Sequence, residues 1–128
     1  MSRSKQTRSR RAKEGVTFDI VRQLALAFPG VVEGGSYGTP AFKVNGKLLA
    51  RFHQDGETLV VKVEYAVREV LMGTNPKTFY VTDHYRCWPY MLVRIANVEK
   101  AVLRQLLEDA WRRNASKRLI AAWETQQQ

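Results

Sequence analysis

The chain has 128 residues, of which 45% are hydrophobic and 26% are charged, as in one soluble globular domain. Its apolar runs are far shorter than the roughly 20 residues that span a bilayer, so no membrane insertion is expected. Cys87 is the single cysteine, which excludes an internal disulfide. Because the N-terminus also lacks a signal-peptide pattern, the sequence predicts a cytoplasmic protein.

Positive charge is concentrated at the N-terminus. The net charge is +9, and six of the 21 basic residues, including Arg10 and Arg11, precede the first acid, Glu14. The rest of the chain is closer to balance, with 15 basic and 12 acidic residues. Because residues 1–15 have few apolar side chains, we expect a disordered basic tail. This tail either adds affinity for nucleic acid or an anionic membrane surface, or is a solvated extension without a specific partner.

The expected domain, residues 16–124, begins with a helix and three strands. Thr17 can cap a helix whose apolar residues recur at helical spacing until Pro29-Gly30 stops it. The glycines between 34 and 38 predict a loop. Asn45-Gly46 favours a type I′ hairpin between two of the strands. The predicted strands cover residues 41–44, 48–53 and 58–63.

A second helix, two strands and two further helices complete the expected order. Residues 64–72 have an apolar face at helical spacing and are followed by Gly73, which can end the helix. Asn97 is expected to cap the longest helix, residues 98–114. A short amphipathic helix follows, and residues 125–128 are expected to fray. The two predicted strands cover residues 79–81 and 90–95.

The order α-β-β-β-α-β-β-α, with a short C-terminal helix, predicts a two-layer α+β fold. We expect an antiparallel five-stranded sheet with its helices on one face, and strand alternation assigns side chains to the two faces. The inner face, against the helices, is expected to carry Leu48, Ala50, Phe52, Leu59, Val61, Val63, Met91, Val93 and Ile95. The outer face is expected to be basic and partly aromatic, with Lys43, Arg51, His53, Lys62, Arg94, Leu49, Val60, Tyr80, Tyr90 and Leu92.

Three separated motifs are distinctive in this order. They are Ser36-Tyr37-Gly38-Thr39-Pro40-Ala41-Phe42-Lys43-Val44-Asn45-Gly46-Lys47, then Asp55-Gly56 before Leu59-Val60-Val61-Lys62-Val63, and Val81-Thr82-Asp83-His84-Tyr85 followed by Pro89 and Leu92-Val93-Arg94. Together they closely resemble the MmcQ/YjbR family of small bacterial proteins, from about residue 18 to residue 119. The resemblance implies a compact α+β domain related to secretion chaperones and, in its sheet and flanking helices, to frataxin-like proteins.

The same resemblance implies DNA binding, the role generally ascribed to the family, and it implies no reaction or cofactor. One departure is visible after His84-Tyr85, where a glycine is expected in many relatives. This chain has Arg86-Cys87-Trp88 instead. These larger side chains bear on any function that needs an open backbone in that loop.

The outer sheet face and the tail make nucleic acid the first candidate partner. Lys and Arg contact phosphates, and Tyr80 and Tyr90 could stack on exposed bases. Because no helix has the Asn- and Arg-rich pattern of a major-groove reader, DNA binding is expected to be largely independent of sequence. The alternatives are a solvated face or a homodimer through Leu49, Val60 and Leu92. The candidate nucleic-acid-binding residues are Arg10, Arg11, Lys43, Arg51, Lys62 and Arg94.

A second hypothesis places a small-molecule or protein-binding pocket between two loops, residues 34–42 and 82–89. The alternative is that the same side chains only stabilise the loops. Catalysis by Cys87 with His84 is disfavoured, and the sequence has no motif for a metal, a nucleotide or another cofactor. We therefore expect a binding protein that is not an enzyme. The candidate pocket residues are Tyr37, Thr39, His84, Tyr85 and Trp88.

Overall fold

A computed structural model describes residues 16–36 and 38–127. Its sheet is antiparallel throughout, with the strand order β1-β2-β3-β4-β6-β5. The strands are β1 (Val32–Ser36), β2 (Thr39–Val44), β3 (Lys47–Phe52), β4 (Thr58–Lys62), β5 (Phe79–Tyr80) and β6 (Tyr90–Arg94). The helices are α2 (Phe18–Leu26), α3 (Tyr65–Thr74), α4 (Lys100–Asn114) and α5 (Lys117–Gln127), with a short 3₁₀ helix η1 (Asp83–Tyr85). The α+β prediction is confirmed.

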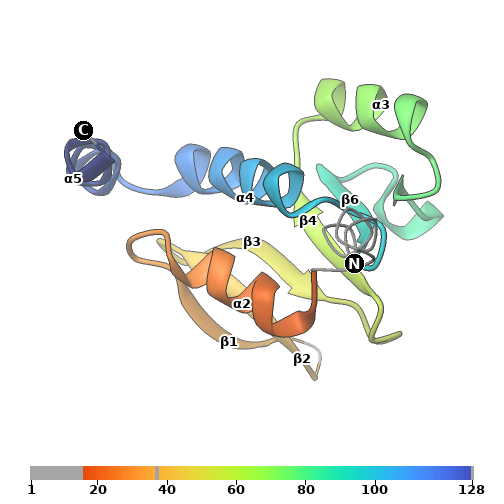
Figure 1. Cartoon of the computed structure of the whole chain (residues 1–128), viewed down its shortest axis with the longest axis horizontal. Helices are drawn as coiled ribbons and strands as arrows, with labels where there is room; N and C mark the ends of the chain where they lie inside the picture. The colour runs from red at the N-terminus through yellow and green to blue at the C-terminus, as the bar shows by residue number, and fades with distance from the viewer. Residues whose placement is uncertain (1–15, 37, 128) are drawn as a thin grey trace, which may run out of the picture.

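The helices α2 and α4 lie together on one side of the sheet, and α3 packs near its β5–β6 end (Figure 1). The hydroxyl of Thr17 caps α2 as predicted and accepts from the backbone N–H of Ile20 at 3.3 Å. Asn97 does not cap α4, because its side-chain amide donates to the carbonyl of Lys77 at 3.2 Å and the helix begins at Lys100. The helix α5 continues to Gln127, past the point where we expected fraying.

The sheet has a sixth strand, β1, that was not predicted from the sequence. Its Gly34 and Gly35 predicted a loop, but both residues are extended and pair with β2. Glu33 anchors the strand to α2, because both carboxylate oxygens accept from Arg22, at 2.9 and 3.0 Å. The bond to Arg22 lowers the pKa of Glu33. The neighbouring strand therefore outweighed the low strand propensity of glycine.

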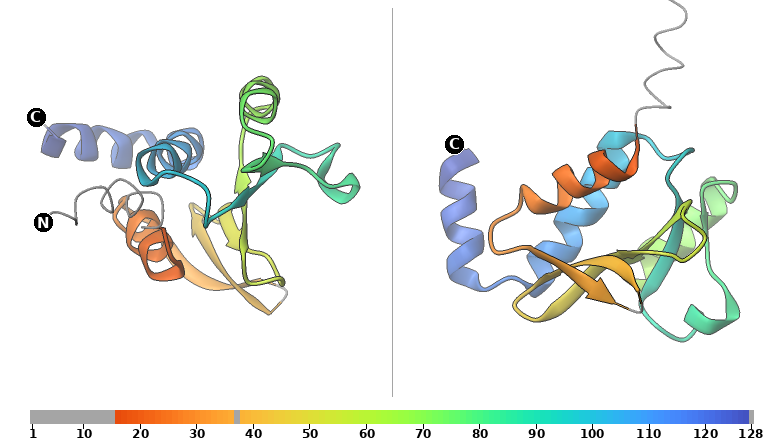
Figure 2. Two further views of the ribbon diagram at one scale, coloured as in Figure 1. Left: turned by 45° about the vertical axis from the view of Figure 1, so that its right-hand side comes forward. Right: turned by 90° about the horizontal axis from the view of Figure 1, so that it is seen from below.

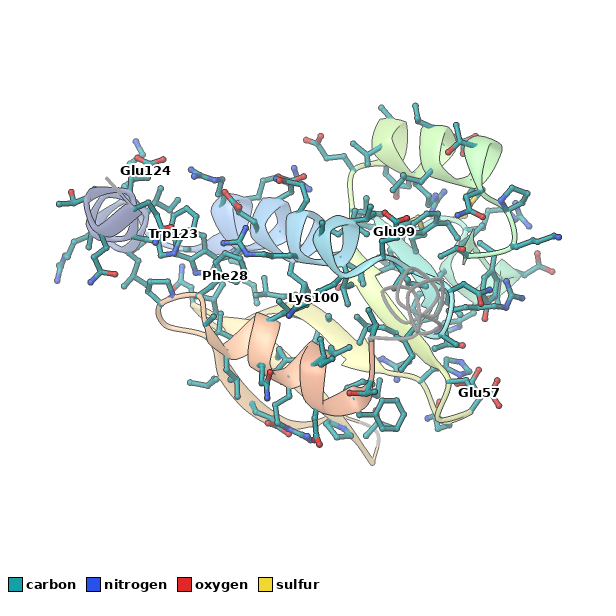
Figure 3. The ribbon with its side chains drawn as sticks, in the orientation of Figure 1. Phe28, Glu57, Glu99, Lys100, Trp123 and Glu124 are labelled. Carbon is teal, nitrogen blue, oxygen red and sulfur yellow. The ribbon has the colours of Figure 1, made fainter. Side chains whose placement is uncertain are left out.

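The main core lies between the inner sheet face and the helices. Trp111 of α4 is fully buried and donates its indole N–H to the carbonyl of Pro29 at 2.8 Å. Its ring lies 5.5 Å from the ring of Phe28 and 5.2 Å from that of Trp123. Phe28 and Trp123 come together beside α4, as Figure 3 shows, with ring centroids 5.6 Å apart. This aromatic group attaches α5 to the rest of the fold.

A β-bulge in strand β3 changes which side chains point to the inner and outer faces of the sheet. Phe42 pairs with Ala50, but the next residue, Lys43, pairs with Leu48, so Leu49 is the extra residue. A bulge reverses the side-chain alternation on one side of it. Leu49 is consequently 1% exposed in the main core, whereas Leu48 faces a cavity on the outer side. The sequence predicted Leu48 on the inner face and Leu49 on the outer face. Both predictions were wrong, because they assumed regular alternation of side chains along the whole strand.

The bulge predicts unequal effects for two adjacent truncations. Leu49→Ala leaves a cavity in a closed core and should lower the free energy of unfolding by about 2–5 kcal/mol. Leu48→Ala removes a half-buried side chain and should cost less than about 1.5 kcal/mol. Urea unfolding of both variants measures the difference. Equal losses, or a larger loss for Leu48→Ala, would contradict the bulged register.

Candidate functional site

The outer face of the sheet is partly covered by the chain itself. A covering segment, residues 82–89, connects β5 to β6 and lies on the side of the sheet opposite α2 and α4, as the left view of Figure 2 shows. Its η1 turn places Tyr85 on the sheet, where it forms a second buried cluster with Val60 and Leu92. Strand alternation predicted the faces of Val60 and Leu92 correctly, but it did not predict this covering segment.

Arg68 of α3 fixes the covering segment through its backbone. Arg68 is 5% exposed. Its guanidinium donates to the carbonyls of Tyr85, Trp88 and Tyr90 at 3.3, 2.9 and 3.0 Å. A further bond of 2.9 Å reaches the carbonyl of Arg86. Backbone carbonyls thus surround this buried cation. The role of Arg68 was not predicted from the sequence, because one arginine in an amphipathic helix normally indicates a solvent-exposed position.

Two further bonds complete the attachment of the covering segment. The hydroxyl of Tyr65, also on α3, donates to the carbonyl of Cys87 at 2.8 Å. The N–H of Val63 donates to the carbonyl of Pro89 at 2.9 Å. Every carbonyl from residue 85 to residue 90 therefore accepts a hydrogen bond. Such complete pairing holds an irregular segment in one conformation without a strand or a long helix.

Arg51 of β3 joins the sheet to the covering segment. It is 7% exposed, and its guanidinium donates to the hydroxyl oxygen of Tyr85 and, at 3.3 Å, to the carbonyl of Phe52. Because a guanidinium can only donate, the oxygen of Tyr85 is the acceptor and its own proton remains available for another acceptor. The pKa of nearby Tyr90 is raised, mainly by burial and also by electrostatic interaction with Tyr85. The positive charge of Arg51 partly offsets this increase in the pKa.

A cavity of about 580 Å³ opens between the outer sheet face and the covering segment. This volume lies in the range of small-molecule sites. Its lining combines apolar Leu48 and Val60 with aromatic and hydrogen-bonding side chains. None of the described lining residues is acidic. The aromatic and basic side chains of this lining are Arg51, His53, His84, Tyr85, Trp88 and Tyr90.

The turn that follows β3 shapes one wall of the cavity and is held by Asp55. Its carboxylate accepts from the N–H groups of Glu57 and Thr58 at 2.8 and 3.0 Å, and from the Thr58 hydroxyl at 2.8 Å. Burial alone would raise the pKa of Asp55, but these bonds, with the charge of His53, lower it. Gln54 and His53 precede this turn and line the cavity.

The residues predicted for a pocket have different surroundings. His84, Tyr85 and Trp88 line the cavity described above. Thr39 lines an adjacent hollow, which shares His53 and Gln54 with the cavity. Tyr37 lies outside the described residues.

The residues predicted for nucleic-acid binding do not share one surface environment. Arg51 is buried beside Tyr85, and Lys62 lines a separate hollow with Glu64 and Arg113. Arg94 is exposed, lies 4.0 Å from the centre of the Tyr80 ring and donates to the carbonyl of Lys77 at 2.9 Å. Lys43 is exposed on β2. Arg10 and Arg11 lie outside the described residues.

The apolar residues considered for a homodimer are not available on the surface. Leu49 belongs to the inner core, and Val60 and Leu92 are buried in the cluster with Tyr85. Among the described residues, no three His, Cys, Asp or Glu side chains are grouped so that they could hold a metal ion. In the same part of the chain, no helix combines the length and the apolar character needed to cross a bilayer.

Comparison with known proteins places this fold. A family model described as YjbR matches residues 26–113. The chain belongs to the YjbR family. The match extends from the end of α2 into α4, so it includes the whole cavity and Arg68 but not the basic tail.

Relatives with known sequences or structures agree with this membership. Uncharacterized protein Rv2570 of Mycobacterium tuberculosis and Uncharacterized protein Mb2600 of Mycobacterium bovis are each 32% identical to the chain over 69 residues. That alignment covers 53% of this chain and 54% of each relative, so the chain spans about half the length of the curated relatives it matches. The crystal structure of Deinococcus radiodurans protein DR2400, with the family-model domain DUF419, superposes with a TM-score of 0.65. At 23% identity over 75% of this chain and 76% of that one, this YjbR-type neighbour supports the fold.

Proposed function

We propose that this YjbR-family protein is a binding module whose outer-face cavity takes a small anionic ligand. The observation that carries the proposal is the buried guanidinium of Arg51 in a cavity without a described acidic lining residue. The proposal takes one element from each hypothesis drawn from the sequence: a basic residue of the sheet face and a ligand pocket beside residues 82–89. It favours a small ligand over an open nucleic-acid track.

The physical basis is the cost of placing a cation away from water. A guanidinium stays charged when buried, so an anion that reaches it gains attraction that bulk water would screen. Arg51 already donates to Tyr85, and the phenolic proton of Tyr85 adds a second donor. His53 and His84 supply further ring nitrogens in the lining. The cavity lining therefore contains several side chains that can donate hydrogen bonds to an anion.

Inorganic phosphate can serve as a probe of this site. Phosphate should bind the wild-type protein saturably, and Arg51→Gln should weaken it at least ~10-fold, because one strong charge-assisted contact is lost. Lys43→Gln is the matched control, since it removes the same charge from an exposed position on the neighbouring strand. Isothermal titration calorimetry at constant ionic strength measures all three proteins.

Arg51→Gln also removes the guanidinium that donates to the hydroxyl oxygen of Tyr85. Circular dichroism should therefore first show that this variant retains the fold. Tyr85→Phe, which keeps the ring and removes the hydroxyl, provides a second test and should weaken phosphate several-fold. Equal losses of phosphate affinity in Lys43→Gln and Arg51→Gln would indicate that phosphate responds to the overall positive charge of the surface and not to a specific site. Absence of saturable binding in the wild type would refute the proposed function.

A second candidate function is DNA binding that does not depend on sequence. It is supported by the net charge of +9, to which the tail contributes strongly, and by the position at which the tail joins the domain. Val16, the first described residue, lines a hollow together with exposed Arg94. Positive charge of the tail and of the domain could therefore act on the same stretch of phosphates.

Deletion of residues 1–13 tests this second candidate. The deletion removes six basic residues. The plot of log affinity against log salt for duplex DNA should therefore become less steep, its slope decreasing in magnitude by up to about five. Affinity should weaken for every DNA sequence alike. Fluorescence anisotropy over a salt series gives both slopes. The same slope with and without the tail would show that the tail does not contact phosphate.

A further inference from the structure

Tyr85 connects the guanidinium of Arg51 to the backbone of the covering segment, and both neighbours belong to the cavity lining. The hydroxyl end of this side chain meets the guanidinium of Arg51. Its backbone end belongs to the covering segment, where its carbonyl accepts from the N–H of Trp88 at 3.0 Å. Arg51 and Trp88 both line the cavity. The lining of one cavity thus includes both a cationic and an aromatic side chain.

Trp88 is exposed although its backbone is firmly held. The residue is 59% exposed. Its backbone N–H nevertheless donates to the carbonyl of Tyr85, and its carbonyl accepts from the guanidinium of Arg68 at 2.9 Å. The exposure therefore does not come from a poorly attached loop. By contrast, the two other tryptophans, Trp111 and Trp123, are 0% and 8% exposed in the main core. An exposed aromatic ring that lines a cavity gains stability when a flat ligand covers it.

Other aromatic rings extend the same wall. The rings of His84 and Tyr85 meet edge to face with centroids 4.7 Å apart, and those of Tyr85 and Tyr90 lie 5.9 Å apart. All three residues line the cavity. A planar ring inside it would therefore meet aromatic edges and faces, which is the environment that favours stacked and edge-to-face pairs.

We propose that the ligand is a planar aromatic ring carrying a phosphate or a carboxylate, with the anion at Arg51 and the ring against Trp88. This inference rests on the proposed anion site and specifies what accompanies the anion. Phosphate and carboxylate share the geometry that a guanidinium recognises through paired hydrogen bonds. The two sources of negative charge are distinguished by the probes below.

The test compares an anion with and without a ring. Calorimetric dissociation constants are measured for inorganic phosphate, phenyl phosphate and benzoate on the full chain. Phenyl phosphate should bind the wild type at least ~10-fold more tightly than inorganic phosphate, in line with the effect of stacking one ring on an aromatic side chain. Whichever of phenyl phosphate and benzoate binds more tightly identifies the preferred anion.

Trp88→Ala assigns the ring to its site. In this variant the advantage of phenyl phosphate over inorganic phosphate should fall to about twofold or less. Val70→Ala is the matched control, because Val70 is an apolar residue, 62% exposed, that lies on α3 and is not part of the cavity lining. Val70→Ala should preserve the full advantage.

The two levels of the proposal fail in different ways. If inorganic phosphate binds and depends on Arg51, but phenyl phosphate shows no advantage, the aromatic part is refuted and the anion site stands. An advantage that persists in Trp88→Ala also refutes the assignment of the ring to Trp88. If none of the three probes binds, both the proposed function and this inference are wrong.

Discussion

The outer face of this protein depends on one buried arginine and the backbone carbonyls that it binds. Arg68 has no described carboxylate partner; its guanidinium instead donates to four carbonyls between residues 85 and 90. Burying a cation is costly, and arginine cannot escape the cost by losing its proton. The four carbonyls offset this cost at the two terminal nitrogens of Arg68, whereas its Nε has no partner among the described residues. The same carbonyls would need other donors without Arg68. Each side of the contact therefore stabilises the other, and an irregular segment becomes a fixed part of the structure.

The position of the covering segment determines what the sheet face can do. With its backbone held by α3, Tyr85 packs over Val60 and Leu92 and accepts from Arg51. Without this cover, Arg51 would be one of several surface cations, as strand alternation alone suggests. With it, the guanidinium is buried in a cavity of ligand size, and the exposed charges that remain, such as Lys43 and Arg94, lie outside that lining. One helix residue thus converts part of a basic surface into a candidate binding site.

Much of the fold could be predicted from local patterns, whereas the site depended on contacts between distant residues. Asn45-Gly46 indicated its hairpin correctly, and both residues have positive φ, 54° and 74°. The strand β1 was missed because its glycines carry no strand signal and only pairing with β2 makes them extended. The bulge at Leu49 was invisible to a count of alternating residues. His84, Tyr85 and Trp88 could be predicted as pocket residues, but nothing near Arg68 in the chain indicates that it binds carbonyls about 20 residues away.

Amide hydrogen exchange in Arg68→Met tests this account most directly. The substitution keeps an apolar stem of similar length and removes every donor of the guanidinium. If Arg68 holds the covering segment, the amides of Tyr85, Trp88 and Tyr90 should exchange at least ~10-fold faster than in the wild type, while the central strands β3 and β4 keep their protection. Glu69→Gln, an exposed change one residue away on α3, should leave all of these rates unchanged. Unaltered exchange across residues 82–90 in Arg68→Met would contradict the account.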